Sequence, residues 1–491
     1  MSHTPLLRNL VRVMQLAQRE NLRAQGAVSP RSREQLNASR RHFLKLKACG
    51  LTRLSPNNIC WVFLFAMLTG LTACGGGTSA SSGTTPITTN TQLDANFGNA
   101  GVVFTDIAGQ SDQALAMATQ PDGYLLIGGS SASGRLIPTD MILARYSPDG
   151  VLDTSFGSGG LVATDFDAGE DSGTCLLLQP DGNIVQAGTA TVAGLGSAGL
   201  VRYTASGSLD NSFGVVGKVV ANYAGLYTRI RACALQTDGS IVIAGDVDNT
   251  IGFMTARFDR DGNLDPTFGD QGWVITDFGF AGDANALTID ANGNIVVVGE
   301  IADPNYQNTV AMMRVLSDGT PDPDFGVAGK VMTSFNQLSD NPTGVVVQGD
   351  GKIVVVGGAQ AANQVGGDIA LARFNPDGSP DLTFGHTGTV ISDIAGNDDN
   401  AYDLALQADG TIVVVGTAVL SGKQKILLQR YRSDGSLDTQ FGMAGNYLVD
   451  LPGNSATATA LVIQSNGNLV VAGYGNPGST NNDMAMLRVI P

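Results

Sequence analysis

The stretch DIALARFNPDGSPDLTFGHTG, residues 368–388, decides the fold, because versions of it recur from one end of the chain to the other. Three markers in or beside the stretch each occur seven times, and successive Phe residues of the Phe-Gly pair lie 55 to 59 positions apart. A fixed period of this length indicates that each repeat is one supersecondary unit. The markers are Phe97, Phe156, Phe213, Phe268, Phe325, Phe384 and Phe441; Arg145, Arg202, Arg257, Arg314, Arg373, Arg430 and Arg488; and the turn pairs that begin at Asp122, Asp181, Asp238, Asn292, Asp350, Asp409 and Asn466.

Composition and charge limit the class of protein. Gly accounts for 64 of the 491 residues and charged residues for only 15%, which is typical of an all-β protein with many turns. Residues 1–73 contain 11 Lys and Arg against 2 Asp and Glu, whereas the remainder contains 17 against 42. A domain with such an acidic excess repels phosphate backbones, so we expect no nucleic-acid partner.

Each repeat contains four short β-prone runs and no segment of helical periodicity. In the fifth repeat they span 330–334, 344–348, 352–357 and 369–374, and Asp350-Gly351 joins the second run to the third. An Asp-Gly pair between two such runs is a strong hairpin signal. Four antiparallel strands per period predict an all-β fold, a seven-bladed β-propeller of four-stranded blades. A β-solenoid is the alternative, although its coils are shorter.

The order of the runs also predicts how the ring closes. The run before the Asp-Gly turn is the smallest and most apolar, so we expect it to be the innermost strand and the first run of each repeat to be the outermost. The repeats begin with a first-type run at 102–106 and stop after a fourth-type run. The last blade would therefore lack an outer strand, and we predict that the N-terminal strand completes it, which removes an open edge.

The repeats resemble a known family. The motifs LDTSFGSGG at 152–160 and QPDGNIVQAG at 179–188 are similar to those of the delta-60 repeat, found in bacterial surface and secreted proteins. The resemblance covers residues 93–491. It implies a repeat domain with little assigned biochemistry, so it adds no ligand and no activity.

The first 73 residues are interpreted as a leader with a signal peptide. The run ICWVFLFAMLTGLTA at 59–73 is shorter than the ~20 residues of a membrane span and suits a signal-peptide core. It ends in Leu71-Thr72-Ala73-Cys74, which resembles the lipobox of bacterial lipoproteins and implies a lipid on Cys74. An ordinary signal peptide with a chance Cys is the alternative. Translation that begins downstream, at Leu44 or Leu51, would shorten the leader.

The expected cellular location follows from the same resemblance. Residues 74–92, which comprise the lipidated Cys and a small polar segment, are interpreted as a flexible tether. Gly75 stands where an Asp would favour the inner membrane, so the resemblance implies an outer-membrane protein anchored through its lipid. The sequence SRRHFLK at 39–45 resembles a twin-arginine export signal, but its apolar core begins late, and general secretion is the other route.

Candidates for chemistry are few. His386 is the one His outside the leader, which disfavours His-based acid–base, triad or metal chemistry. We assign no catalytic residue, expect no cofactor and no metal, and find no nucleotide or protease motif. Cys175 and Cys233 are the two Cys of the repeats, and we expect both to be small core residues rather than a disulfide framework.

The recurring motif itself is interpreted as structural. An Asp begins each D-x-x-F-G-x-x-G segment and the recurring Arg ends the fourth strand, so we expect an ion pair that locks strand to loop. The Gly residues suit turns and the Phe would wedge between blades. Ca²⁺ binding by paired Asp is the alternative, but that ion takes six to eight oxygens.

A second set of acidic residues is the candidate binding face. They lie where the chain enters the innermost strand, on the side of seven variable loops at 130–139, 189–197, 246–252, 300–309, 359–367, 417–423 and 474–482. Variable loops around a funnel mouth are common binding sites. An acidic ring there could attract a cation or a basic partner, and solvated loop charge is the alternative. The residues are Asp112, Asp171, Asp283, Asp340 and Asp399.

Two functions fit these observations. The first is a monomeric cell-envelope lipoprotein whose propeller binds a protein or glycan partner or serves as a scaffold. The second is a secreted propeller hydrolase that cleaves envelope or extracellular polymers through carboxylates at the funnel.

Overall fold

The structure, a computed structural model, describes residues 91–132, 139–248, 252–302, 307–335, 339–360, 366–394, 396–478 and 481–491. The leader, Cys74 and the tether up to residue 90 lie outside the described residues. The described chain belongs to one compact unit, Pro86–Pro491. Among its described residues, no helix is long and apolar enough to cross a lipid bilayer.

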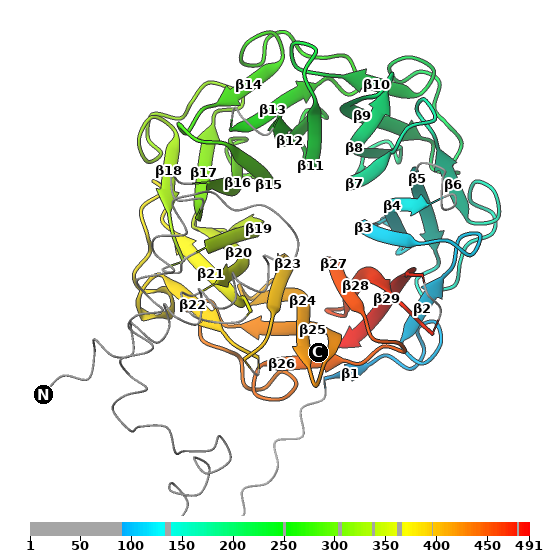
Figure 1. The fold of residues 1–491 in the computed structure, drawn as a ribbon, viewed down its shortest axis with the longest axis vertical. Coiled ribbons are helices and arrows are strands. Elements are labelled where there is room, and N and C mark those ends of the chain that lie inside the picture. The colour runs from blue at the N-terminus through cyan, green and yellow to red at the C-terminus, as the bar shows by residue number, and fades with distance from the viewer. Residues whose placement is uncertain are drawn as a thin grey trace, which may run out of the picture. The chain divides into compact units, whose positions relative to one another are not determined.

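The described strands form seven antiparallel sheets around a central axis, each sheet being one blade (Figure 1). The predicted seven-bladed β-propeller is therefore confirmed, with the predicted order from inner to outer strand. The strands of blades 1 to 4, from the axis outward, are β3 (Asp112–Thr119), β4 (Leu125–Ala132), β5 (Thr139–Tyr146) and β6 (Leu161–Thr164); β7 (Ser172–Leu178), β8 (Ile184–Val192), β9 (Leu195–Tyr203) and β10 (Lys218–Ala221); β11 (Thr228–Leu235), β12 (Ile241–Val247), β13 (Phe253–Phe258) and β14 (Trp273–Thr276); β15 (Gly282–Ile289), β16 (Ile295–Ala302), β17 (Asn308–Val315) and β18 (Lys330–Thr333).

Blades 5 to 7 repeat this order, and the two ends of the chain meet in blade 7. The strands of blades 5 and 6 are β19 (Ser339–Val347), β20 (Ile353–Gln360), β21 (Asp368–Phe374) and β22 (Thr389–Ser392); β23 (Asp399–Leu406), β24 (Ile412–Leu420), β25 (Lys423–Tyr431) and β26 (Asn446–Val449). Blade 7 contains β27 (Ala456–Ile463), β28 (Leu469–Gly475), β29 (Asp483–Ile490), β1 (Gln92–Leu93) and β2 (Val102–Thr105). A short 3₁₀ turn, η3 (Phe384–His386), lies in blade 5.

Strand β2 closes the ring as predicted. It pairs antiparallel with β29, Val102 facing Leu487, and β1 pairs with the end of the same strand. Gln92, which we expected in the tether, is thus already part of a strand. The preceding Thr91 also takes part, because its hydroxyl accepts a hydrogen bond from the Gly442 N–H at 3.0 Å. In the other blades a main-chain carbonyl accepts the corresponding hydrogen bond, as the carbonyl of Asp434 does from the Gly385 N–H.

The second strand of each blade is buried on both faces, which explains its continuous apolar sequence. All of β20 except its last residue is buried. The inner strand carries a β-bulge in every blade, in blade 5 between Pro342 and Gly344. Strand β19 continues through this bulge and begins five residues earlier than predicted. Opposite each bulge stands a Gly of the second strand, such as Gly357, because a Cβ there would collide with the main chain of the inner strand.

The recurring Phe residues fill the space between neighbouring blades. All seven are 0% exposed. Phe97, from the closing segment, packs with Leu125 and Tyr146 of blade 1 and with Val470 of blade 7. The hydrophobic core is therefore divided into clusters at the blade junctions, and each Phe stabilises one junction.

The two Cys residues of the repeats form a disulfide, which corrects the expectation that they are unpaired core residues. Cys175 on β7 and Cys233 on β11 are bonded, with their Cα atoms 5.8 Å apart. Their separation of 58 residues equals one repeat, so they occupy neighbouring places on the inner strands of blades 2 and 3. That match of spacing to period was the signal available in the sequence.

Two of the seven variable loops are tight hairpins rather than open loops. Strands β8 and β9 continue to a two-residue turn at Ala193-Gly194, and β24 and β25 to one at Ser421-Gly422. All four residues have positive φ, as a type I′ hairpin requires. Blades 2 and 6 therefore extend their middle strands further than the sequence pattern predicted.

Candidate functional site

The propeller has two faces of different character. The strands of a blade are counted from the axis outward, so the fourth run of each sequence repeat is the third strand of its blade. The turn face carries, in every blade, the turn between the first and second strands and the D-x-x-F-G-x-x-G segment after the third strand. The loop face carries the connections between the second and third strands and the segments by which the chain enters each inner strand. Parts of five connections, at 133–138, 249–251, 303–306, 361–365 and 479–480, lie outside the described residues.

On the turn face, each recurring Arg binds the recurring Asp of the next segment. In blade 1, Arg145 Nε donates to Asp153 Oδ2 at 2.8 Å, and the guanidinium lies 4.6 Å from the centre of the Phe156 ring. Another of its nitrogens donates to the Ala205 carbonyl of blade 2 at 2.6 Å. The expected ion pair occurs in every blade, as Arg145–Asp153, Arg202–Asp210, Arg257–Asp265, Arg314–Asp322, Arg373–Asp381, Arg430–Asp438 and Arg488–Asp94.

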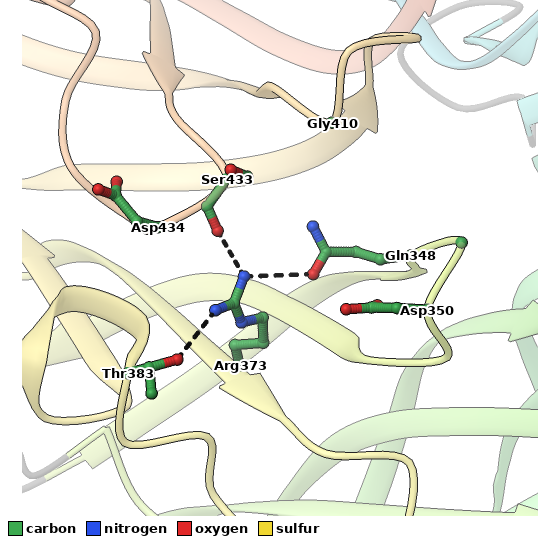
Figure 2. A pocket seen from close by; sticks show the side chains of 8 residues that line it. Gln348, Asp350, Arg373, Thr383, Gly410, Ser433 and Asp434 are labelled. Carbon is green, nitrogen blue, oxygen red and sulfur yellow. Dashed lines mark hydrogen bonds between the residues drawn. The ribbon is translucent and has the colours of Figure 1, made fainter.

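A hollow of about 460 Å³ on this face shows the same arrangement in blades 5 and 6. Figure 2 shows Arg373 at its centre, with its guanidinium directed at Gln348, Thr383 and the main chain of Ser433. These partners come from two neighbouring blades, and the other blades repeat the arginine. The hollow is therefore the seam between two blades rather than a distinct binding site.

Four of the five acidic residues of the candidate binding face are buried. Asp112, Asp171, Asp340 and Asp399 are each 0% exposed. Each accepts a hydrogen bond from the main-chain N–H five residues upstream, as Asp171 does from Phe166 at 2.8 Å. They lie on the loop face as predicted, but they fix the segments that link blades and are not presented to solvent as a ring.

Burial changes the acidity of these four carboxyl groups. It raises the pKa of Asp112 and of Asp399 to about 6, and neighbouring carboxylates add to the effect. Burial also raises the pKa values of Asp171 and Asp340. A buried carboxylate without a cation beside it is expensive to ionise.

Asp283 lies in a different place from the other four. The segment before it is one residue shorter, so Gly282 takes the buried position and Asp283 faces Glu300 across the pair β15–β16. There its Oδ2 accepts hydrogen bonds from Arg229 at 3.1 Å and from Arg231 at 2.7 Å. Both arginines belong to β11 of blade 3. Asp283 is therefore part of a charged group that joins blades 3 and 4.

This charged group, which we call the blade 3–4 cluster, consists of Arg229, Arg231, Asp246, Asp283 and Glu300. Arg229 Nε donates to the buried Asp246 at 2.9 Å. Burial raises the pKa of Asp246, and it raises that of Glu300, with the charge of Asp283 adding to the shift. Asp246 Oδ2, Glu300 Oε2 and Arg231 Nε are buried and make no hydrogen bond within the described residues. A buried polar atom of this kind calls for an explanation.

Two exposed aromatic side chains come from the same part of the loop face. Tyr227 precedes β11 and is 38% exposed, and Phe280 precedes β15 and is 36% exposed. Both stand two or three residues before a charged member of the cluster along the chain. Aromatic and Arg side chains are the residues most enriched where proteins bind their partners.

Inspection of the sequence alone missed the blade 3–4 cluster. The inner-strand position of Arg229 is occupied in other blades by Gln113, Ser172, Asn341, Asn400 and Thr457. Strict alignment of the repeats would show Arg229 and its blade 4 counterpart Asp283 as charged residues at a position that is uncharged in the other five blades. The useful signal in a repeat protein is thus a departure from the repeat rather than its most frequent motif.

The sequence matches a known β-propeller family. Six repeats, at 120–156, 179–213, 236–268, 291–325, 348–384 and 407–441, match the family described as a β-propeller domain of unknown function (DUF5122). This is a repeat of the delta-60 type that the sequence motifs suggested. The seventh blade is divided between the two ends of the chain, so a repeat read along the sequence does not cover it. No curated protein matches the sequence.

Several solved structures have a similar fold. A protein of unknown function from Dyadobacter fermentans is 12% identical, with 81% of this chain and 98% of that chain covered and a TM-score of 0.46. A polysaccharide lyase of family PL25, an ulvan lyase, is 11% identical, with 80% and 95% covered and a TM-score of 0.46. The α-L-arabinanase of Penicillium chrysogenum is 14% identical, with 79% and 97% covered and a TM-score of 0.40. These likenesses concern the fold alone.

Proposed function

We propose that the protein is a binding or scaffold module of the bacterial cell envelope that holds a protein or glycan partner at the loop face of blades 3 and 4. The observation that carries this proposal is the blade 3–4 cluster, where the repeat departs from its pattern to bring charged groups together; two exposed aromatic residues, Tyr227 and Phe280, precede members of the cluster along the chain. A repeat needs no such departure to fold, since the other blades fold without it.

The chemistry of the cluster favours a polar partner. The side chains of Arg229 and Arg231 are about a third exposed, at 31% and 32%, so part of each can be reached from solvent. A ligand hydroxyl or amide could satisfy the buried oxygens of Asp246 and Glu300. Tyr227 and Phe280 would supply the apolar contact area. A sugar chain or a peptide offers both kinds of group.

The binding test compares two pairs of arginines. Replacement of Arg229 and Arg231 by Gln should weaken capture of envelope glycans or proteins at least tenfold, because it removes both cations of the cluster. The matched control replaces Arg260 and Arg432, which are 64% and 50% exposed on the turn face. Equal binding by both variants, with unchanged thermal unfolding, would show that the partner binds elsewhere.

We also propose that the protein is anchored to the outer membrane through Cys74, as a monomer without a nucleic-acid partner. The disulfide between Cys175 and Cys233 supports an address outside the cytoplasm, because disulfides persist in oxidising compartments. Cys74→Ala should abolish incorporation of a labelled fatty acid and release the protein from membranes. Labelling that survives this change would refute the lipid anchor.

The second candidate function is a hydrolase of envelope polymers, and Glu300 favours it. Burial raises the pKa of Glu300, which is the direction of shift that a general acid in glycoside hydrolysis requires. Glu300→Gln keeps the shape of the side chain. Loss of a polymer cleavage activity in this variant, with unchanged capture of the glycan or protein partner, would favour the hydrolase over the scaffold.

A further inference from the structure

Three junctions between blades contain a group of three carboxylates on the loop face. In each group, one oxygen from every residue lies within 4.8 Å of the others. One Asp lies at or next to the start of the third strand of a blade, one follows its outer strand, and one lies at or next to the start of the inner strand of the next blade. The groups are Asp106, Asp112 and Asp483 at the closing junction; Asp140, Asp165 and Asp171; and Asp368, Asp393 and Asp399.

Two of the three groups contain a buried oxygen without a partner. Asp112 and Asp399 are 0% exposed, and Oδ1 of each makes no hydrogen bond within the described residues. In the remaining group both oxygens of Asp171 accept main-chain hydrogen bonds, and the Lys218 ammonium lies 2.6 Å from the carbonyl of Asp165. The unsatisfied acceptors thus occur where no lysine approaches within the described chain.

The junction of blades 6 and 7 shows what the chain does when it supplies its own cation. Lys425 stands five residues before the recurring Arg430, the place that Asp483 holds before Arg488. Its ammonium lies 2.9 Å from Asp450, which follows the outer strand. The third place, at the start of the inner strand, is taken by Ala456. Where the chain places a lysine at the start of the third strand, the buried carboxylate at the start of the next inner strand is therefore absent.

The junction at Asp340 has a buried carboxylate but not the group of three carboxylates. Oδ1 of Asp340 also lacks a hydrogen bond within the described residues. At that junction Ser334 follows the outer strand and Thr309 stands five residues before Arg314, so two of the three carboxylates are replaced by hydroxyls. The junction has the buried acceptor but not the charge that would hold a cation.

We propose that the group of Asp106, Asp112 and Asp483 and the group of Asp368, Asp393 and Asp399 each bind one divalent cation. The donors are all oxygens, which favours Ca²⁺ or Mg²⁺ over a transition metal. Ca²⁺ fits better, because carboxylates from three separate segments make the flexible, oxygen-rich site that this larger ion accepts. The proposal is independent of the binding function proposed above.

The first of these sites would also fasten the ring. Asp106 follows the N-terminal strand β2, Asp112 begins blade 1 and Asp483 begins the C-terminal strand β29. The N–H of Asp112 already donates to the Asn482 carbonyl at 2.7 Å, so the three segments are held together before any ion binds. A cation there would neutralise their mutual repulsion and link both ends of the chain to blade 1.

The experiment titrates the full-length protein, stripped of metal with EDTA, with CaCl₂ in a calorimeter and follows its thermal unfolding in parallel. We expect two sites per chain and a higher unfolding temperature in Ca²⁺ than in EDTA. A chain that releases no binding heat and shows no change of unfolding temperature would overturn the proposal. Equal protection by Na⁺ at the same ionic strength would also overturn it, because it would show only screening of charge.

A double variant tests the closing site without a loss of fold. Asp112→Ala combined with Asp483→Lys copies the natural arrangement of Lys425, Asp450 and Ala456, so it should fold and bind one ion instead of two. Asp122→Asn, on the exposed turn face, is the control and should keep both sites. Should the double variant not fold, Asp483→Asn alone should lower the affinity of one site at least tenfold. Two unchanged sites in a folded variant would refute the assignment of these residues.

Discussion

The carboxyl groups of the two faces have opposite properties. On the turn face, a hydrogen bond from the Ser155 hydroxyl and the charge of Arg145 lower the pKa of Asp153, and Asp210 follows the same pattern with Ser212 and Arg202. On the loop face, burial raises the pKa values of Asp246 and Glu300. The turn face therefore stabilises its negative charges, whereas the loop face holds them at a cost.

Asp450 shows that partners rather than position cause this difference. It lies on the loop face, yet its pKa is lowered, first by a hydrogen bond from Lys425. The turn face supplies such a partner in all seven blades because the repeat encodes it. The loop face supplies one at some junctions only, and single oxygens of Asp112, Asp399 and Asp246 make no hydrogen bond within the described residues. Regularity thus marks the scaffold, and unpaired charge marks the candidate sites.

Removal of the closing segment should have the largest effect, because it opens the ring that both faces share. Deletion of residues 93–106 removes β2, Asp94 and Phe97, so the loss should exceed the roughly 3–5 kcal/mol of one buried Phe. Chemical unfolding should show a far lower midpoint or no cooperative transition. Deletion of residues 75–88 in the tether should change nothing. A stable, cooperative chain without 93–106 would contradict closure by the N-terminal strand.

Loss of one Phe at a blade junction on the turn face should have the next largest effect on stability. Phe268→Ala empties the space that a fully buried ring fills between blades 3 and 4, and we expect a loss of about 3–5 kcal/mol in the free energy of unfolding. Val327→Ala, at a position 80% exposed in a neighbouring turn, should stay within about 0.5 kcal/mol. Similar losses for both variants would mean that the Phe does not stabilise the blade junction.

The pH dependence should be the smallest effect and should differ in sign between two aspartates. Burial raises the pKa of Asp403 on β23 to about 6, above its value in the unfolded chain. The penalty of its ionised form is full above pH 6 and disappears as pH falls towards 4. Asp403→Asn keeps an acceptor for the Leu461 N–H but loses the one for the Leu404 N–H. The stability of this variant relative to the parent protein should therefore rise by roughly 1–3 kcal/mol between pH 4 and pH 8.

Asp409 on the turn face is the matched case of opposite sign. A hydrogen bond from the Thr411 hydroxyl lowers the pKa of Asp409, so its contribution is present above its unfolded pKa and is lost as pH falls through the folded value. Asp409→Asn should slightly destabilise the protein at pH 7 and have no effect at very low pH. Urea unfolding of both variants between pH 2 and 8 measures the contrast. Parallel pH profiles would refute the difference between the two environments.

Much of the fold was predictable, because each signal for it is local and repeated. The spacing of Phe, Arg and Asp-Gly specified the number of blades, and the phase of the repeats specified the closing strand. The ion pair between Arg145 and Asp153 was predictable for the same reason, since eight residues and one turn separate the partners.

The candidate site was less accessible to sequence reasoning. The shorter segment before Gly282 moves Asp283 by one position, and in a strand one position turns a side chain to the other face. The partners of Asp283 come from a repeat more than 50 residues away. The disulfide of Cys175 and Cys233 likewise required knowledge that consecutive inner strands are neighbours.

The sequence by itself determined an all-β ring of seven repeats, its inner and outer strands and its closure, because periodic patterns and turn residues act over a few positions. Tertiary structure alone decided which charges have partners. Whether Asp112 meets two further carboxylates, or Asp450 meets a lysine, depends on side chains that three different segments bring to one junction. Their electrostatic energy depends on distance and burial in space, and neither can be read along the chain.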